Sequence, residues 1–140
     1  MMQICFEVPG QPRGKGRPRF ARRGHFVKTY TDAATASYED QIRFYALQAM
    51  GSSEPLKTAL EAFIYVRLPV PKSYPKKRVA ACLSSSEWPC KKPDLDNIVK
   101  SYMDGMNGIV YVDDSQVVEI HTTKVYSETG GVDVLIKEKE

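Results

Sequence analysis

Residues 94–106 constrain the fold of this chain most, because an apolar pattern and a concentration of acid fall on the same stretch. Apolar side chains recur there at helical spacing, at Leu95, Ile98, Val99, Tyr102 and Met106. The pattern predicts an amphipathic helix that is capped by Asp94 or Asp96, packs on a core and reaches about residues 107–108. Five aspartates also fall between positions 94 and 114. Carboxylates gathered this densely repel one another unless a cation or a proton holds them together, so the stretch predicts a cation site.

The rest of the chain is typical of an α/β (α+β) fold in which a mixed, mostly antiparallel sheet packs against two main helices. Alternating apolar residues predict strands at residues 3–8, 25–30, 60–68 and 132–136. The strand at 60–68 is expected at the centre of the sheet, because aromatic residues on its second face imply burial there as well. The second main helix is expected at 33–50, ended by Gly51.

Two shorter segments are expected to complete this architecture. A helix is predicted at 75–83, with Ser73 as its cap and Pro75 in its first turn. Residues 109–112 and 116–126 are expected to pair as a hairpin around Asp113-Asp114-Ser115. In such a turn one carboxylate can face the neighbouring helix while the other caps the turn or faces solvent.

Length and composition indicate one globular domain spanning residues 1–140. A chain of 140 residues can bury a core without the help of disulfides or structural metals. A composition of 42% hydrophobic and 26% charged residues disfavours disordered and collagen-like classes. No apolar run approaches the roughly 20 residues of a membrane span. The N-terminus lacks a signal-peptide pattern, and Cys5, Cys82 and Cys90 match neither a disulfide framework nor a zinc site. We therefore expect a cytoplasmic protein without a membrane partner.

Charge is segregated along the chain, although the formal net charge is only +3. Residues 10–30 hold seven Lys/Arg and no Asp/Glu, whereas residues 87–119 hold seven Asp/Glu and three lysines. Prolines and glycines predict that 10–24 is a basic loop without a regular element, and its glycine spacing fits neither common phosphate-binding pattern. An anionic polymer is attracted to the loop and repelled by the acidic region unless cations lie there, as in a metal-dependent nuclease. The residues expected to contact a nucleic acid are Arg13, Lys15, Arg17, Arg19, Arg22, Arg23, Lys91 and Lys92.

The acidic region at 92–116 offers carboxylates from two elements. Asp94 and Asp96 are expected to approach one ion from the N-terminal end of the helix, and the Asp113-Asp114 turn adds a third carboxylate. Three carboxylates suit an oxygen-ligated Mg²⁺ that retains several waters. Such an ion can activate a water and neutralise charge on a scissile phosphate. Lys100, one turn after Asp96, can neutralise transition-state charge as well.

Simpler interpretations exist for individual residues of this region. Aspartate caps helices and turns without any ion, and Lys100 with Asp104 could form only an exposed i,i+4 salt bridge. Capping needs one aspartate, however, and does not account for the whole set. A calcium-binding helix–loop–helix is excluded, because its loop pattern is not matched after Asp96. His25 and His121 are expected to lie outside the catalytic site, in a hairpin and in a strand.

Three motifs stand in order over residues 92–120: Lys-Pro-Asp-Leu-Asp-Asn-Ile-Val-Lys, Met-Asp-Gly-Met-Asn-Gly and Asp-Asp-Ser-Gln-Val-Val. A basic stretch precedes them, running from Pro-Gly-Gln-Pro through Gly-Arg-Pro-Arg to Thr-Tyr-Thr. In order and spacing these motifs resemble the RusA family of Holliday junction resolvases, endonucleases that cut four-way DNA junctions. The basic stretch is similar to the N-terminal region of the phage-borne branch of that family.

The resemblance implies a small mixed α/β fold and a homodimer with two active sites. It also implies dependence on Mg²⁺, with Mn²⁺ as a substitute, and paired symmetric nicks in four-way or other branched DNA during recombination and repair. A C2 pair is the simplest way to make two symmetric cuts. By position, the implied metal ligands are Asp94, Asp96 and Asp114, the implied catalytic lysine is Lys100, and Asp104 and Asp113 are supporting acids.

Two other functions stay open at the level of the sequence. In a non-catalytic protein that binds branched DNA, the aspartates would only cap helices and turns, and the basic loop would carry all of the binding. EDTA would then leave every activity unchanged. A metal-dependent nucleotide-sugar transferase would use Asp94-Leu95-Asp96 to hold a metal diphosphate. The small size and the lack of a recognisable nucleotide-binding half disfavour that second alternative.

Overall fold

The centre of the fold is a four-stranded sheet. The computed structural model describes residues 2–15, 19–23, 26–30 and 33–140, and the side chains of residues 2–15 and 37–140. The sheet has the order β1-β6-β4-β5 and is formed by β1 (Gln3–Pro9), β4 (Leu60–Pro69), β5 (Val117–Ser127) and β6 (Gly131–Glu138). β6 pairs antiparallel with β1 and β4, whereas β5 pairs parallel with β4. The mostly antiparallel sheet with β4 inside it is therefore confirmed.

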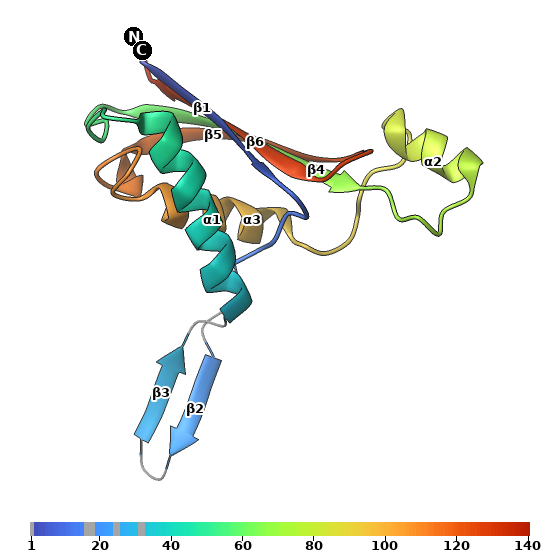
Figure 1. Cartoon of the computed structure of the whole chain (residues 1–140), viewed down its shortest axis with the longest axis horizontal. Helices are drawn as coiled ribbons and strands as arrows, with labels where there is room; N and C mark the ends of the chain where they lie inside the picture. Colours follow the sequence, from blue (N-terminus) through green and yellow to red (C-terminus); the bar gives the residue numbers. More distant parts are fainter. Residues whose placement is uncertain (1, 16–18, 24–25, 31–32) are drawn as a thin grey trace.

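Two helices, α1 (Ala33–Met50) and α3 (Leu95–Met106), pack on one face of this sheet (Figure 1). Even-numbered residues of β4 from Leu60 to Val66 are buried against them, and odd-numbered residues lie on the opposite face. The apolar stripe of α3 faces the core as predicted, since Ile98, Tyr102 and Met106 are fully buried. Within the described residues, every helix is too short or too polar to cross a bilayer.

Close contact between α1 and α3 fixes the position of α3. The hydroxyls of Tyr38 and Tyr102 are 2.6 Å apart in the buried interface. Gly105 lies against α1, where an added Cβ would be 2.6 Å from Cγ2 of Ile42. A larger side chain at Gly105 would force the two helices apart.

The short helix α2 (Lys76–Leu83) lies beyond the end of the sheet, away from α1 and α3 (Figure 1). It packs through a small separate cluster in which Cys82 contacts Leu68 and Tyr126. The predicted helix is confirmed, but its cap is wrong. Pro75 occupies the N-cap position without a side-chain hydrogen bond, so Ser73 is not the cap. A proline is tolerated there because the first N–H groups of a helix have no partner within it.

The prediction that residues 10–24 contain no regular element is wrong. β2 (Arg19–Arg23) pairs antiparallel with β3 (Phe26–Tyr30) as a separate two-stranded sheet. Residues 19–23 contain neither proline nor glycine, although both flank them in the sequence. The composition of residues 10–24 as a whole argues against a strand. β3 nevertheless supplies the backbone hydrogen bonds that β2 needs.

The predicted hairpin between 109–112 and 116–126 is also wrong. Residues 109–112 form no strand, and β5 pairs with β4 instead. The reason is burial, because Tyr111 is fully buried and its hydroxyl donates a hydrogen bond of 2.7 Å to the Met103 carbonyl of α3. After this turn the chain forms the short 3₁₀ helix η1 (Asp114–Gln116) and enters β5 directly.

Candidate metal centre and nucleic-acid interface

Asp94 and Asp96 lie at the N-terminal end of α3. Asp94 occupies the N-cap position, yet its carboxylate makes no capping hydrogen bond. It accepts instead a hydrogen bond of 2.9 Å from Lys92 Nζ, and its side chain is 43% exposed. Asp96 is exposed in the first turn, where the helix dipole favours negative charge. Capping therefore does not explain Asp94, and both carboxylates remain accessible to a ligand.

Lys100 lies one turn further along α3 and is largely exposed. Its Nζ is 3.5 Å from Oδ2 of Asp104, the i,i+4 pair that the spacing suggests. The same Asp104 oxygen is 3.1 Å from Nζ of Lys15. Because Asp104 already pairs with Lys15, Lys100 is a secondary partner of Asp104 and its ammonium stays available to solvent or ligand.

Lys15, expected in the sequence to contact DNA, is bound within the protein. Its backbone N–H donates 2.8 Å to the Asn97 carbonyl of α3, and its Nζ donates to the buried Glu39 of α1. Burial alone would lower the pKa of Lys15, but hydrogen bonds with Glu39 and Asp104 outweigh burial, and the pKa is raised. Lys15 therefore ties the start of the basic segment to both helices.

Asp113 and Asp114 have different environments. The Asp113 carboxylate caps η1 by accepting a 3.1 Å hydrogen bond from the Ser115 N–H, and Gln116 completes a capping box. Bonding with Ser115 lowers the pKa of Asp113 below its ordinary value. Asp114 is half-buried at the start of η1 and has no capping role of this kind.

Three of the aspartates act on the buried side chain of Tyr111. Burial raises the pKa of the Tyr111 hydroxyl, and the negative charges of Asp114, Asp104 and Asp113 raise it further. The charges of these three carboxylates therefore act on one buried phenol. Asp94 and Asp96 stand at the N-terminal end of α3, the helix that Tyr111 contacts through the Met103 carbonyl.

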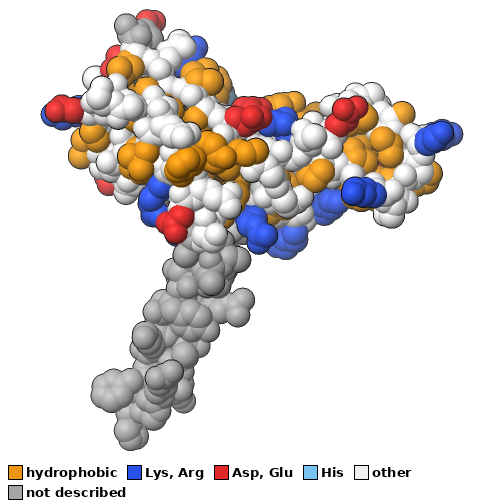
Figure 2. Space-filling model, in the orientation of Figure 1, with side chains coloured by type: hydrophobic (Ala, Val, Ile, Leu, Met, Phe, Trp, Pro, Cys, Tyr) orange, Lys and Arg blue, Asp and Glu red, His pale blue; other side chains and the backbone are white. Residues whose placement is uncertain are grey.

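A basic groove adjoins the N-terminal end of α3. It has a volume of about 390 Å³ and its lining includes Lys72, Lys91 and Lys92. Lys124 of β5 holds the chain next to it, because its Nζ donates to the carbonyls of Lys91 at 2.8 Å and Pro93 at 3.0 Å. Figure 2 shows Lys and Arg side chains along the lower edge of the region that leads to α2.

The remaining predicted DNA contacts are placed only in part. Arg13 is exposed, as are Lys91 and Lys92. Arg17 lies outside the described residues, as does His25, and the side chains of Arg19, Arg22 and Arg23 also lie outside them.

The three predicted metal ligands are not gathered into one compact donor set. In the part of the chain that the structure describes, one group of three donor side chains brings its ligand atoms within 4.8 Å of one another, and it consists of Glu61, Glu119 and His121. Asp94, Asp96 and Asp114 are more widely spread. Their all-oxygen chemistry still fits Mg²⁺, which usually takes one or two carboxylates directly and keeps several waters.

Sequence reasoning missed two clusters of charged residues, one at α1 and one on the opposite face of the sheet. Glu39 gave a faint signal, because it follows Tyr38 on the buried stripe of α1, where an acid needs a partner. The group of Glu61, Glu119 and His121 gave none, since its members are spread along the sequence and meet only through the register of β4 and β5.

Comparisons with known proteins agree with the motifs. The family model described as Endodeoxyribonuclease RusA matches residues 9–137. The chain is 33% identical to the Uncharacterized protein YqaN of Bacillus subtilis (strain 168) in a match of 138 residues, and the match covers 96% of this chain and 96% of that protein. It is also 38% identical over 53 residues to the Crossover junction endodeoxyribonuclease rusA of Lactococcus phage r1t, covering 37% of this chain and 40% of the phage protein. This chain belongs to the RusA endodeoxyribonuclease family.

Proposed function

We propose that this protein resolves four-way DNA junctions by paired, symmetric nicks that depend on Mg²⁺ or Mn²⁺, in DNA recombination and repair. The observation that carries the proposal is the N-cap of α3, where Asp94 leaves its carboxylate free of capping. Asp96 and Lys100 follow on the same helix, in a chain of the RusA family. The Asp94 carboxylate, paired only with the exposed Lys92, is therefore available to a ligand.

In this proposal Asp94, Asp96 and Asp114 hold the metal ion. When bound, such an ion supplies charge neutralisation at the scissile phosphate and a more acidic water. Lys100 places its ammonium beside the phosphate and stabilises the charge that develops in the transition state. Asp104, already paired with Lys15, keeps that ammonium on the correct side of α3.

The basic groove is the proposed path of one DNA strand toward α3. Lys72, Lys91 and Lys92 offer three ammonium groups to successive phosphates, and Lys92 also contacts Asp94. Contacts of this kind position the backbone and carry no sequence information. Lys124 supports the groove by hydrogen bonds from its Nζ to the backbone carbonyls of Lys91 and Pro93.

Two symmetric nicks require two active sites, so we propose a homodimer with C2 symmetry. A molar mass close to twice 15.8 kDa by light scattering at working concentration is expected. A value that stays at the mass of one chain, also when junction DNA is added, would contradict the dimer.

The test is cleavage of a synthetic four-way junction with Mg²⁺. The parent protein should nick two strands symmetrically and lose this activity in EDTA. Asp96→Asn should bind the junction with near-parent affinity but cleave it about 10²-fold more slowly or worse, because one charge that fixes the ion is removed. The matched control is Asp40→Asn, an aspartate with a side chain 76% exposed on α1, which should cleave like the parent. Binding without any cleavage by the parent would instead indicate a non-catalytic junction-binding protein.

A further inference from the structure

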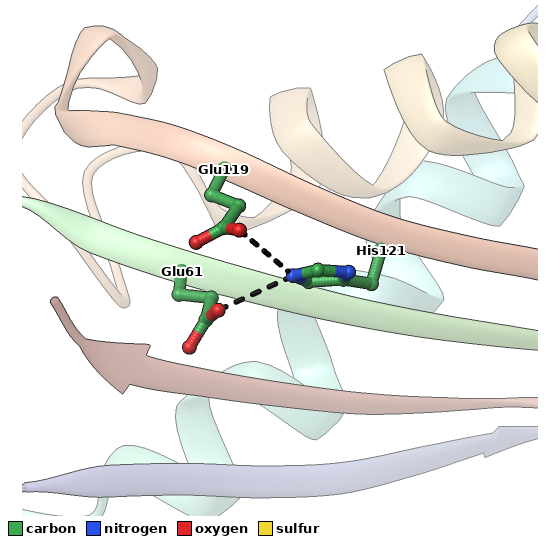
Figure 3. A group of neighbouring side chains, drawn as sticks. All are labelled: Glu61, Glu119 and His121. Atoms are coloured by element: carbon green, nitrogen blue, oxygen red, sulfur yellow. Dashed lines mark hydrogen bonds and ion pairs between the residues drawn. The ribbon is translucent and has the colours of Figure 1, made fainter.

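Glu61, Glu119 and His121 form a compact group on the face of the sheet opposite α1 and α3. Figure 3 shows both carboxylates turned toward the same imidazole nitrogen. Nε2 of His121 is 3.2 Å from Oε2 of Glu61 and 3.3 Å from Oε1 of Glu119. All three donor atoms lie within 4.8 Å of one another. Donors that surround one ion at about 2.0–2.2 Å are themselves separated by roughly 3–3.5 Å, so this group has the spacing of a ligand set.

The strand register produces this convergence. In the parallel pairing of β4 with β5, Glu61 lies opposite Glu119, and Phe63 lies opposite His121. Side chains two residues apart on one strand share a face, so all four project from the same side of the sheet. The geometry is therefore set by the backbone of two paired strands, the most rigid kind of support for a ligand set.

Neighbouring side chains orient each donor. The Phe63 ring stacks on the His121 imidazole with centroids 4.7 Å apart and planes 13° from parallel. Lys139 Nζ donates to Oε2 of Glu119 at 2.6 Å, which leaves Oε1 directed toward His121. That hydrogen bond lowers the pKa of Glu119 below its ordinary value. Supporting contacts of this kind fix the orientation of metal ligands in known sites.

We propose that Glu61, Glu119 and His121 bind one transition-metal dication, with Zn²⁺ as its representative, and that the ion joins β4 to β5. An imidazole with two carboxylates suits Zn²⁺ better than Mg²⁺, which prefers oxygen ligands alone. The His121 side chain is 48% exposed and that of Glu119 is 36% exposed, so solvent can reach the remaining coordination positions. The ion has a separate role from the metal proposed at α3.

Such an ion would hold together parts of the chain that are far apart in sequence. Glu61 and His121 are 60 residues apart, and the intervening chain carries α2, α3 and η1. Closing a long loop restricts the unfolded chain more than closing a short one. β5 also begins directly after η1, so an ion at Glu119 would stabilise the segment that positions Asp114.

A protonated His121 that bridges the two carboxylates is the competing explanation of the same geometry. The metal site and the protonated bridge predict different responses to added metal. The chain has two histidines, so the ring signals of His121 can be followed by ¹⁵N NMR with those of His25 as an internal reference. Zinc chloride added to the full-length protein at pH 7.5 should shift the Nε2 resonance of His121 at one equivalent, and MgCl₂ should not. Unchanged His121 signals at tenfold excess Zn²⁺, or an equal response to Mg²⁺, would overturn the proposal.

Isosteric variants identify the ligands. Glu61→Gln and Glu119→Gln should each weaken the Zn²⁺ response of His121 by at least about tenfold, since each removes a charged donor. The matched control is Glu128→Gln, an exposed glutamate in the turn between β5 and β6, which should bind Zn²⁺ like the parent. Parent-like binding by both ligand variants would overturn the ligand assignment. Hydrogen exchange of the β5 amides should also slow when Zn²⁺ is added, and unchanged exchange would overturn the role of the ion in joining the strands.

Discussion

The aspartates along α3 and the group on the opposite sheet face are both rich in acid, but they are built differently. The aspartates lie close together in sequence, on α3 and at η1, but Asp94, Asp96 and Asp114 do not form a set with all donor atoms within 4.8 Å of one another. Glu61, Glu119 and His121 are distant in sequence and their donor atoms lie within 4.8 Å. In the function proposed above, the aspartates face an anionic substrate through a hydrated ion. In the site proposed on the sheet face, a compact set with a nitrogen donor binds its ion directly, and only the fold brings that set together.

The largest expected effect separates the two adjacent acids of η1. Asp114→Asn should lower junction cleavage by about 10²-fold or more, because it removes a proposed metal ligand. Asp113→Asn should stay within a few-fold of the parent, because asparagine caps as well as aspartate does. Cleavage rates under single-turnover conditions measure both. The reverse order of effects would show that Asp113, despite capping η1, is the acid that acts.

A stability measurement tests how the α3 surface is held in place. Lys15→Met should lower the free energy of unfolding by about 1.5–3 kcal/mol, because it removes charged hydrogen bonds from Glu39 and Asp104 in a half-buried site. Lys57→Met, at an exposed position, is the control and should have little effect. Urea unfolding compares the two. Equal stability of both variants would mean that Lys15 does not anchor the basic segment.

A smaller effect is expected where α3 packs on α1. Gly105→Ala should cost about 1–3 kcal/mol of stability, because the new methyl group would overlap Ile42. Ile42→Ala removes Cγ2, the nearest overlapping atom, so Gly105→Ala should cost less stability in the Ile42→Ala background than in the parent. Thermal unfolding followed by circular dichroism gives both values. If the second substitution only adds to the loss, steric overlap is not the cause.

The smallest effect concerns the sheet face and acid pH. The hydrogen bond from Lys139 lowers the pKa of Glu119 from its ordinary value of 4.5. The stabilisation from this pair is therefore complete above pH 4.5 and is lost as pH falls through the lowered pKa of the folded state. Glu119→Gln should accordingly show a shallower loss of stability between pH 5 and pH 3. An unchanged pH dependence would indicate that Lys139 and Glu119 are not paired in solution.

Local patterns predicted most of the architecture. Helices α1 and α3 and strand β4 follow from apolar spacing, because each buries one face or stripe in the core. The hairpin at 109–112 was predicted wrongly because a short apolar run looks the same whether it pairs in a sheet or is buried in a turn, as Tyr111 is. β2 was missed because the prolines and glycines around it indicate a loop. Its strand conformation depends on pairing with β3, which the sequence of β2 alone does not reveal.

The candidate site could be predicted only where its residues lie close together in the sequence. Asp94, Asp96 and Lys100 share one helix, so spacing alone placed them on one element. The role of Asp113 as a cap depends on a Ser115 hydrogen bond that no spacing reveals. Lys15 was grouped with DNA-binding cations, because its partners Glu39 and Asp104 come from two other parts of the chain.

One measurement tests most directly the claim that cleavage belongs to the α3 surface and not to the sheet face. Asp96→Asn and His121→Asn are compared with the parent on the same four-way junction with Mg²⁺ and no other divalent ion. The account predicts a loss of about 10²-fold or more for Asp96→Asn and a change within about threefold for His121→Asn. Parent-like cleavage by Asp96→Asn together with a large loss for His121→Asn would contradict it.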